Sequence, residues 1–328
     1  NELRKARSHN SKRTAIIVSL VIGLVLGPFV IKKLKQFHAR QSEREEGPES
    51  HKYKAGTPTM GGILILTALT VACLLFDPME IRKALALFLT LGHGVIGFLD
   101  DSIKAVKHRN LGLTAKQKLA GQFVMAAVFC YILQAFLHFP TTLWIPFTSI
   151  TVDLGWFYYL FVFVMIVGAS NAVNLTDGLD GLAAGSCSIT AVAYVVIAVA
   201  LGYTHFAIFS TALTGACLGF LFYNQHPAKM FMGDTGSLAL GGALAAMAIL
   251  TKTELLLILA GGLYVLEALS VIIQVISFKT RGVRVFKMSP IHHHFELSGW
   301  SEVKVVTVFW SFSALMAILA IIVVMAGK

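Results

Sequence analysis

The sequence predicts an all-α polytopic membrane protein with about ten transmembrane helices. Charged residues make up only 13% of the 328 residues, against about 25% in soluble domains. Hydrophobic residues make up 56%, and the mean hydropathy is +0.74. The uncharged residues lie in long blocks, each about the 20 residues that cross a bilayer as a helix. These features exclude a disordered chain, an ordinary soluble domain and, despite the net charge of +10, an ordinary nucleic-acid-binding protein.

Ten apolar blocks follow one another along the chain. In lipid every backbone polar group needs a partner within the protein, so we expect helices; the alternation that a barrel requires is absent. The block 181–228 contains no Asp, Glu, Lys or Arg and divides at 201–205 into two spans. The predicted spans are 14–31, 55–76, 84–99, 119–137, 154–173, the two halves of 181–228, 235–251, 255–278 and 305–327. The chain therefore divides into a basic tail, 1–13, and one integral membrane domain, 14–328.

The connections between these spans alternate between two sides of the membrane. One side carries 32–54, 100–118, 174–180, 224–234 and 279–304, with 18 of the 27 Lys and Arg. Positive residues favour the cytoplasm, so we expect this side to be cytoplasmic and both termini to be periplasmic. Five basic residues in the tail oppose this orientation. The tail is either a non-native extension or a segment that reorients the first span. The opposite connections are chemically bland, which predicts a single active face on the cytoplasmic side.

The third span ends in a group of charged residues. Asp100, Asp101 and Lys104 lie within one helical turn, so all three can approach one another. Two adjacent carboxylates repel unless a cation is near, and a divalent metal or phosphate-bound Mg²⁺ would relieve this. The alternative is a solvated helix end with an i,i+4 ion pair.

Polar residues recur at every third position between the fifth and sixth spans, at Asn171, Asn174, Asp177 and Asp180. Each Asp is followed by a glycine, which permits close approach of a ligand. Helix capping and an Asp-Gly turn explain one or two of the four. The full run favours a wall of donors and acceptors around a polar ligand or metal.

Two further segments face the same side. Asp234 comes just before a predicted helix start, where backbone N–H groups favour an anion; a simple cap is the alternative. Phe231 is either a stacking platform or an interfacial anchor. Before the second span, Lys54 and Thr59 lie in a flexible segment at the membrane surface, and the Gly-Pro-Glu-Ser-His sequence at 47–51 precedes it.

The last long connection contains His292, His293 and His294 after four basic residues. Adjacent side chains diverge and no Cys is nearby, so we expect phosphate recognition in place of a shared metal. The alternative is a loop of solvated histidines. Glu267 and Gln274 lie on one face of the ninth span, where polar residues are either functional or form contacts between helices.

The mixture of carboxylates, cations and helix starts on one face fits phosphoryl transfer. Carboxylates hold Mg²⁺ through a few oxygens, while basic groups and helix starts hold phosphates. A body of many spans with one aqueous site implies one lipid substrate and one soluble substrate.

These motifs resemble the polyprenyl-phosphate N-acetylhexosamine-1-phosphate transferases. Within that superfamily, the forms at 47–51, 56–62 and 290–296 look like the phospho-N-acetylmuramoyl-pentapeptide transferases of bacteria. The resemblance runs from about residue 14 to the C-terminus. It implies a ten-span dimer of the bacterial cytoplasmic membrane that requires Mg²⁺. Its substrates would be UDP-N-acetylmuramoyl-pentapeptide and undecaprenyl phosphate, and its products lipid I and UMP.

The resemblance also implies roles for individual residues. Asp234 would be a Mg²⁺ ligand, and Asp100 and Asp101 would either deprotonate or orient the lipid phosphate or help to hold the metal. The nucleoside and diphosphate pocket would be lined by Asn174, Asp177, Gly178, Leu179, Asp180, Asn224 and Phe231, with Phe231 stacked on uracil. Polar parts of the donor would contact Lys54, Thr59, Gln274 and His292, His293 and His294. With Lys104 and Asn171, these residues form the predicted substrate and catalytic set.

Three other functions are weighed against this one. A sister enzyme that uses UDP-N-acetylglucosamine shares the Asp motifs but not the 290–296 form. A secondary transporter would place polar sites near the bilayer midplane, often in repeated halves; only Glu267 is clearly within a span, and no repeat is evident. A membrane metalloprotease would carry His-Glu-x-x-His, which is absent from the sequence.

Overall fold

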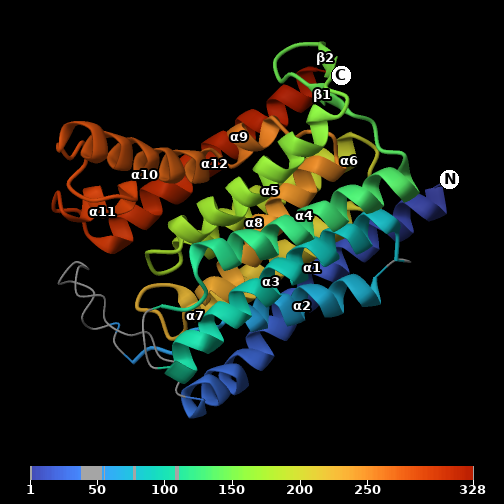
Figure 1. Ribbon diagram of the computed structural model, residues 1–328. Helices are drawn as coiled ribbons and strands as arrows, with labels where there is room; N and C mark the ends of the chain where they lie inside the picture. Colours follow the sequence, from blue (N-terminus) through green and yellow to red (C-terminus); the bar gives the residue numbers. More distant parts are fainter. Residues whose placement is uncertain (1, 38–53, 55, 77–78, 108–110, 328) are drawn as a thin grey trace.

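The structure is a computed structural model, and it describes residues 2–37, 54, 56–76, 79–107 and 111–327. The segment at 47–51, one of the three on which the narrower resemblance rests, lies outside the described residues. Figure 1 shows a bundle of long helices, with the end of α12 beside the β-hairpin and the start of α1 further along the same end of the bundle.

Almost all of the described chain is helical. The helices are α1 (Glu2–Gln36), α2 (Gly62–Leu75), α3 (Ile81–Lys107), α4 (Ala115–Leu137), α5 (Phe157–Thr176), α6 (Leu182–Ala200), α7 (Ala207–Asn224), α8 (Gly233–Leu250), α9 (Leu256–Ala260), α10 (Gly262–Arg281), α11 (Ile291–Glu296) and α12 (Glu302–Ala326). Within the described ranges, nine helices are long and apolar enough to cross a membrane, and α2 is a shorter apolar helix of 14 residues. A polytopic helical membrane protein is therefore confirmed.

The centre of the bundle is α8. It packs against α3, α5, α2 and α6, and it is buried along almost its whole length. Its sequence is rich in Gly and Ala, which lets neighbouring backbones approach closely in a membrane bundle. The outer helices α4, α10 and α12 are buried on a narrower face and expose apolar residues on the other. This arrangement fixes the first turn of α8 against the last turns of α3 and α5.

Three predicted elements differ from the structure. The second span begins at Gly62 instead of residue 55, because Pro58 and the Gly61–Gly62 pair hold the preceding segment out of the helix. The ninth span is divided into α9 and α10 at Gly261. An antiparallel hairpin, β1 (Thr142–Trp144) and β2 (Thr151–Asp153), occupies a connection in which we expected no strand. Its Thr and Val residues favour extended backbone.

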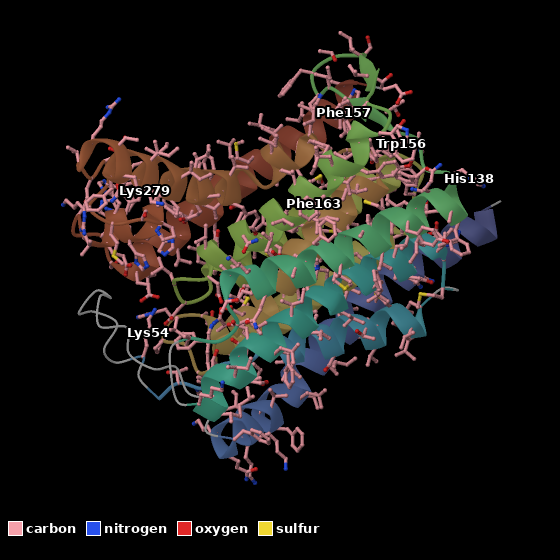
Figure 2. All side chains as sticks on the ribbon, in the orientation of Figure 1. Lys54, His138, Trp156, Phe157, Phe163 and Lys279 are labelled. Carbon is pink, nitrogen blue, oxygen red and sulfur yellow. The ribbon has the colours of Figure 1, made fainter. Side chains whose placement is uncertain are left out.

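The connections opposite the carboxylates are not bland, and that expectation was wrong. Lys252, just beyond α8, donates to Glu254 at 2.9 Å and to the carbonyl of Thr142 at 2.6 Å. Figure 2 shows Lys54 at one end of the bundle and Trp156 and Phe157 at the other. These two aromatic side chains are highly exposed, as is typical of residues at a membrane interface.

Candidate active site

Three carboxylates from two helices meet at one end of the bundle. Asp100 and Asp101 lie near the end of α3, and Asp234 lies in the first turn of α8. Each offers an oxygen that lies within 4.8 Å of the oxygens of the other two. Asp100 and Asp101 are buried, whereas the Asp234 side chain is 16% exposed. Asp234 is therefore the member of the group that a ligand from solvent can reach.

Asp101 holds the start of α8. Its carboxylate accepts the backbone N–H groups of Asp234 at 3.2 Å and Thr235 at 2.9 Å, and the Thr235 hydroxyl at 2.7 Å. The first N–H groups of a helix have no partner within it and carry partial positive charge. Asp101 thus caps α8 from a neighbouring helix, and both of its oxygens are engaged.

Two ammonium groups lie between Asp100 and Asp234. The Lys104 Nζ lies 2.5 Å from Asp100 Oδ2 and 3.4 Å from Asp234 Oδ2. The Lys118 Nζ lies 3.1 Å from Asp100 Oδ1 and 2.6 Å from Asp234 Oδ2. Three carboxyl groups face two ammonium groups, which is an excess of acidic over basic groups. Such an excess favours the binding of a further cation.

The spacing between the carboxylates depends on a close backbone contact between α3 and α8. A Cβ atom on Gly97 would lie 2.1 Å from the backbone oxygen of Asp234, closer than any real contact. Only glycine fits at this crossing. The turn of α3 that ends in Asp100 and Asp101 is thereby held directly against the first turn of α8.

The α5–α6 connection reaches the same carboxylates. The Asn174 Nδ2 donates to Asp234 Oδ1 at 3.0 Å and to Ser237 Oγ at 2.8 Å. Burial raises the pKa of Asp177 well above its usual range, and the charges of Asp234 and Asp101 raise it further. The raised pKa favours the protonated form of Asp177, which can donate a hydrogen bond.

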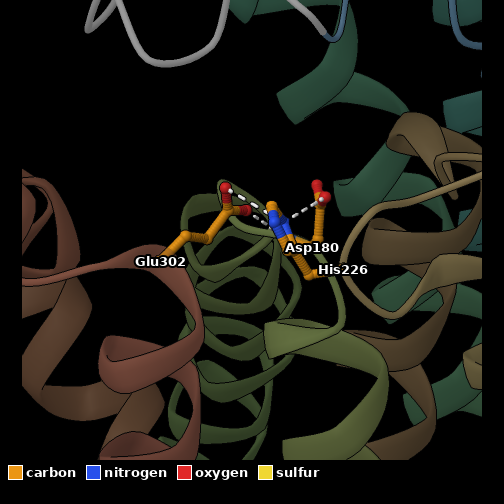
Figure 3. A group of neighbouring side chains, drawn as sticks. All are labelled: Asp180, His226 and Glu302. Carbon is orange, nitrogen blue, oxygen red and sulfur yellow. Dashed lines mark hydrogen bonds and ion pairs between the residues drawn. The ribbon is translucent and has the colours of Figure 1, made fainter.

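A second charged cluster joins four segments of the chain. Figure 3 shows Asp180, His226 and Glu302 turned toward one another. The Lys54 Nζ lies 2.8 Å from Asp180 and 2.7 Å from Glu302, and the His226 Nδ1 lies 3.2 Å from Asp180. Glu302 also accepts the backbone N–H of Asp180 at 2.7 Å. These three groups are close enough to hold a metal ion, but the Lys54 ammonium already supplies positive charge there.

The segment before α2 pairs with the segment before α8. The backbone N–H of Phe231 donates to Pro58 at 2.8 Å, and the N–H groups of Gly61 and Gly62 donate to the carbonyls of Phe231 and Met232 at 2.8 and 2.9 Å. Residues far apart in the sequence thus form one wall of the site.

Comparison with known proteins identifies the family of the chain. The profile described as glycosyl transferase family 4 matches residues 83–252, and a phospho-N-acetylmuramoyl-pentapeptide-transferase signature matches residues 54–66. Proteins named phospho-N-acetylmuramoyl-pentapeptide-transferase are similar over nearly the whole chain. The protein of Halalkalibacterium halodurans is 57% identical over 310 residues, which are 93% of this chain and 95% of the relative. That of Bacillus subtilis is 53% identical over 310 residues, with the same coverage.

The chain belongs to the phospho-N-acetylmuramoyl-pentapeptide-transferase family. A relative from a Geobacillus species is 55% identical over 311 residues, which are 94% of this chain and 96% of the relative. The resemblance seen in the sequence motifs is therefore confirmed, and the protein is a membrane-embedded phosphoglycosyl transferase.

The three consecutive histidines have three different hydrogen-bond partners. The His292 Nδ1 lies 3.0 Å from both carboxylate oxygens of Glu267, and the His293 Nδ1 lies 2.9 Å from Glu296. The His294 Nδ1 accepts a backbone N–H from the preceding loop at 3.1 Å. This divergence follows from their adjacency in α11, and the three do not share one ion site.

Some predicted ligand-binding residues hold the loops of the site. Both ends of the Gln274 amide bond to backbone groups of the loop after α10, at 2.8–3.0 Å. Asn224 donates to the Met230 carbonyl at 2.9 Å and accepts the Gly181 N–H at 3.1 Å. Leu179 is buried in a small apolar cluster, so only its backbone can face a ligand.

Other predicted residues lie along the edge of the site. The Lys54 ammonium lies 5.9 Å from the centre of the Phe231 ring, which is only partly buried. Thr59 lies beside the turn at Gly233 that starts α8. Asn171 donates to Gln122 at 3.2 Å. It faces a pocket of about 390 Å³, which is lined by Leu113, Ala115, Lys118, Leu119, Gln122 and Asn171.

Sequence reasoning missed Lys118, His226 and Glu302. Lys118 follows the capping box of Thr114 and Gln117 at the start of α4, where a basic residue is an ordinary surface choice. Glu302 lies in the first turn of α12, where an acid is favoured by the helix dipole alone. Only the packing of α4 and α12 against the site reveals their partners.

Proposed function

We propose that this protein transfers phospho-N-acetylmuramoyl-pentapeptide from its UDP-linked donor to undecaprenyl phosphate, which yields lipid I and UMP. The observation that carries the proposal is the group of Asp100, Asp101 and Asp234 with two ammonium groups, at one end of membrane-spanning helices. The names of the relatives support the choice of substrates.

The carboxylate group fits Mg²⁺. All three members offer hard oxygen ligands within 4.8 Å of one another, and their charge exceeds that of the neighbouring ammonium groups. Asp234 would be the principal ligand because its side chain is partly exposed, whereas Asp100 is buried and its two oxygens already contact Lys104 and Lys118. Asp101 contributes mainly by fixing α8, since both of its oxygens accept hydrogen bonds. When bound, Mg²⁺ supplies charge stabilisation to the diphosphate.

The transfer proceeds by one displacement at phosphorus. An oxygen of the lipid phosphate attacks the donor β-phosphorus, and the bond from that phosphorus to the bridging oxygen breaks to release UMP. The second pKa of a phosphate monoester is about 6, so the nucleophile is largely ionised and needs no general base. Lys104 and Lys118 orient the lipid phosphate and stabilise charge on the transferring group.

The donor occupies the wall formed by the α5–α6 connection and the segments before α2 and α8. Asn174, Asp177 and Asp180 bind its polar groups, and the Phe231 ring stacks on uracil. Lys54 and Thr59 border the same space, and the His292–His294 motif contacts the donor. Basic residues concentrate on these connections, which supports a site that faces the cytoplasm at a bacterial membrane. We also propose that the protein is a dimer.

The test is UMP release by the purified chain in detergent with both substrates and Mg²⁺. We expect release to depend on lipid, on metal and on Asp234, and to be faster than with UDP-N-acetylglucosamine. Asp153→Asn is the matched control, because Asp153 is an exposed carboxylate at the opposite end. Release from the glucosamine donor alone would contradict the proposed substrate.

A second measurement tests the single displacement. Labelled UMP is incubated with the donor and Mg²⁺ in the absence of lipid phosphate. We expect no label in the donor, because direct transfer requires the acceptor. Clear exchange would show instead a two-step reaction through an aspartyl intermediate.

A further inference from the structure

Glu267 and His292 form a buried pair away from the carboxylate group. Glu267 lies in the membrane-spanning helix α10 and His292 in α11, and both side chains are fully buried. The His292 Nδ1 lies 3.0 Å from each carboxylate oxygen of Glu267. A carboxylate within a membrane helix is costly unless it has a partner and is by default linked to function.

The other ring nitrogen of His292 faces the donor-binding connection. Its Nε2 is buried and has no hydrogen-bond partner among the described residues. A Cβ atom on Gly178 would lie 2.3 Å from this nitrogen, so the ring packs directly on the Gly178 backbone. Gly178 lies between Asp177 and Asp180, which belong to the proposed donor site.

The contacts favour one tautomer of His292. A carboxylate accepts hydrogen bonds and cannot donate them, so Nδ1 carries the proton that Glu267 binds. In the neutral ring the Nε2 atom then presents a lone pair. The proton on Nδ1 is present in both ring forms that can donate to Glu267, so the contact fixes this proton and the orientation of the ring.

We propose that Glu267 is a positioning residue for donor binding. It fixes the orientation of His292 and its Nδ1–H tautomer, and His292 in turn braces the Gly178 turn of the donor-binding connection. The Nε2 edge of the ring lies on the Gly178 backbone, so His292 acts by supporting this turn. The inference rests on the proposed function and assigns His292 to donor binding rather than to proton transfer.

Two substitutions separate the hydrogen bond from the packing. In Glu267→Gln the amide oxygen still accepts the Nδ1–H, whereas Glu267→Met keeps the side-chain volume and loses the acceptor. We expect Met to raise the KM for the UDP-linked donor about tenfold or more, as loss of a partner that orients a histidine does. The KM for undecaprenyl phosphate stays unchanged, and Gln remains within about threefold of the parent.

Ser270→Ala is the matched control. Ser270 is buried one turn further along α10, and its hydroxyl bonds only to the Glu267 backbone carbonyl in the described contacts. We expect parental KM values for both substrates. Equal effects of Gln and Met, or a rise in the KM for the lipid, would overturn the proposal.

The tautomer is measured directly by ¹⁵N NMR of histidine-labelled protein in detergent, with His292→Gln to assign the signal. We expect a protonated Nδ1 in the parent and in Glu267→Gln; an unprotonated Nδ1 in the parent would overturn the proposal. This measurement holds even if Glu267→Met does not fold. It also separates the two proposals, because absence of UMP release from the parent refutes the function while the NMR result still tests the pair.

Discussion

The two ends of α8 hold charged groups in different balance. At the Asp234 end, three carboxylates meet two ammonium groups. Beyond the other end, a single ammonium, that of Lys252, lies 2.9 Å from Glu254, 3.1 Å from the Tyr158 hydroxyl, and 3.1 and 2.6 Å from two backbone carbonyls. Burial lowers the pKa of Lys252, and the charge of Glu254 opposes this effect.

This comparison distinguishes charged groups that stabilise the fold from charged groups that can bind a ligand. Lys252 is surrounded by acceptors and has no capacity for a ligand, so it fixes the β1 connection to the end of α8. The Asp234 group has more negative charge than its own lysines neutralise, and it is partly open to solvent. A surplus of buried charge beside a solvent opening indicates a binding site better than the number of charges does.

The largest effect is expected from Asp234→Asn. This change removes the exposed carboxylate and should lower the rate of UMP release about a thousandfold. The melting temperature should fall, because the ion pairs of Asp234 with Lys104 and Lys118 are lost. A titration with Mg²⁺ should show that high metal does not restore the rate. If the variant retained more than about a tenth of the parental rate, the Asp234 group, like the Lys252 group, would not be needed for transfer.

Lys118→Met is expected to have the next largest effect. Loss of this ammonium leaves Lys104 alone between Asp100 and Asp234, and we expect the rate to fall about a hundredfold. The measurement is UMP release at saturating donor. The exposed Lys279→Met is the matched control and should retain the parental rate. If both variants behaved alike, Lys118 would be a surface residue without a role in transfer.

Lys252→Met is expected to affect stability and leave the chemistry unchanged. It strands Glu254 without its cation, and breaking such a pair lowers the free energy of unfolding by about 3 kcal/mol. A thermal melt in detergent should show a lower transition, while kcat for the folded fraction stays parental. A parental melting temperature would show that the Lys252 contacts do not stabilise the fold.

The smallest effect is expected from Asp177→Asn. Because its pKa is raised in the folded state, Asp177 binds a proton on folding at any pH between its unfolded value of about 4 and its folded value. Parental stability is therefore lost as the pH rises through this window, and Asn removes the loss. Melts from pH 4 to pH 8 should show a growing advantage for the variant. A constant difference would mean that Asp177 is ionised.

The spans and the gathering of the Asp motifs could be predicted from the sequence. Charge and length mark the apolar blocks, and alternate connections must return to the same side, which brings Asp100, Asp101, Asn174 and Asp234 together. Their roles in metal and donor binding remain predictions. The break at Gly261 could not be predicted, because a single glycine within an apolar block is common in membrane helices.

The contact partners of the site residues could not be predicted from the sequence, for a different reason. Lys54 and Glu302 are 248 residues apart, and their contact at 2.7 Å depends on how α12 packs against α6. Glu267 and Gln274 share one helix face, as expected, yet one bonds to His292 and the other to a loop backbone. Periodicity identifies the face but not the partner.

The contact at Gly97 has a consequence for heating. Because the α3 backbone touches the Asp234 carbonyl with no side chain between, the spacing of the two backbone turns that carry the carboxylates is as rigid as the helices themselves. The carboxylate side chains can rotate below the melting transition, but the backbone positions from which they project stay fixed. The affinity for a divalent ion should therefore stay nearly constant with rising temperature and vanish together with the helix pair, in one cooperative step.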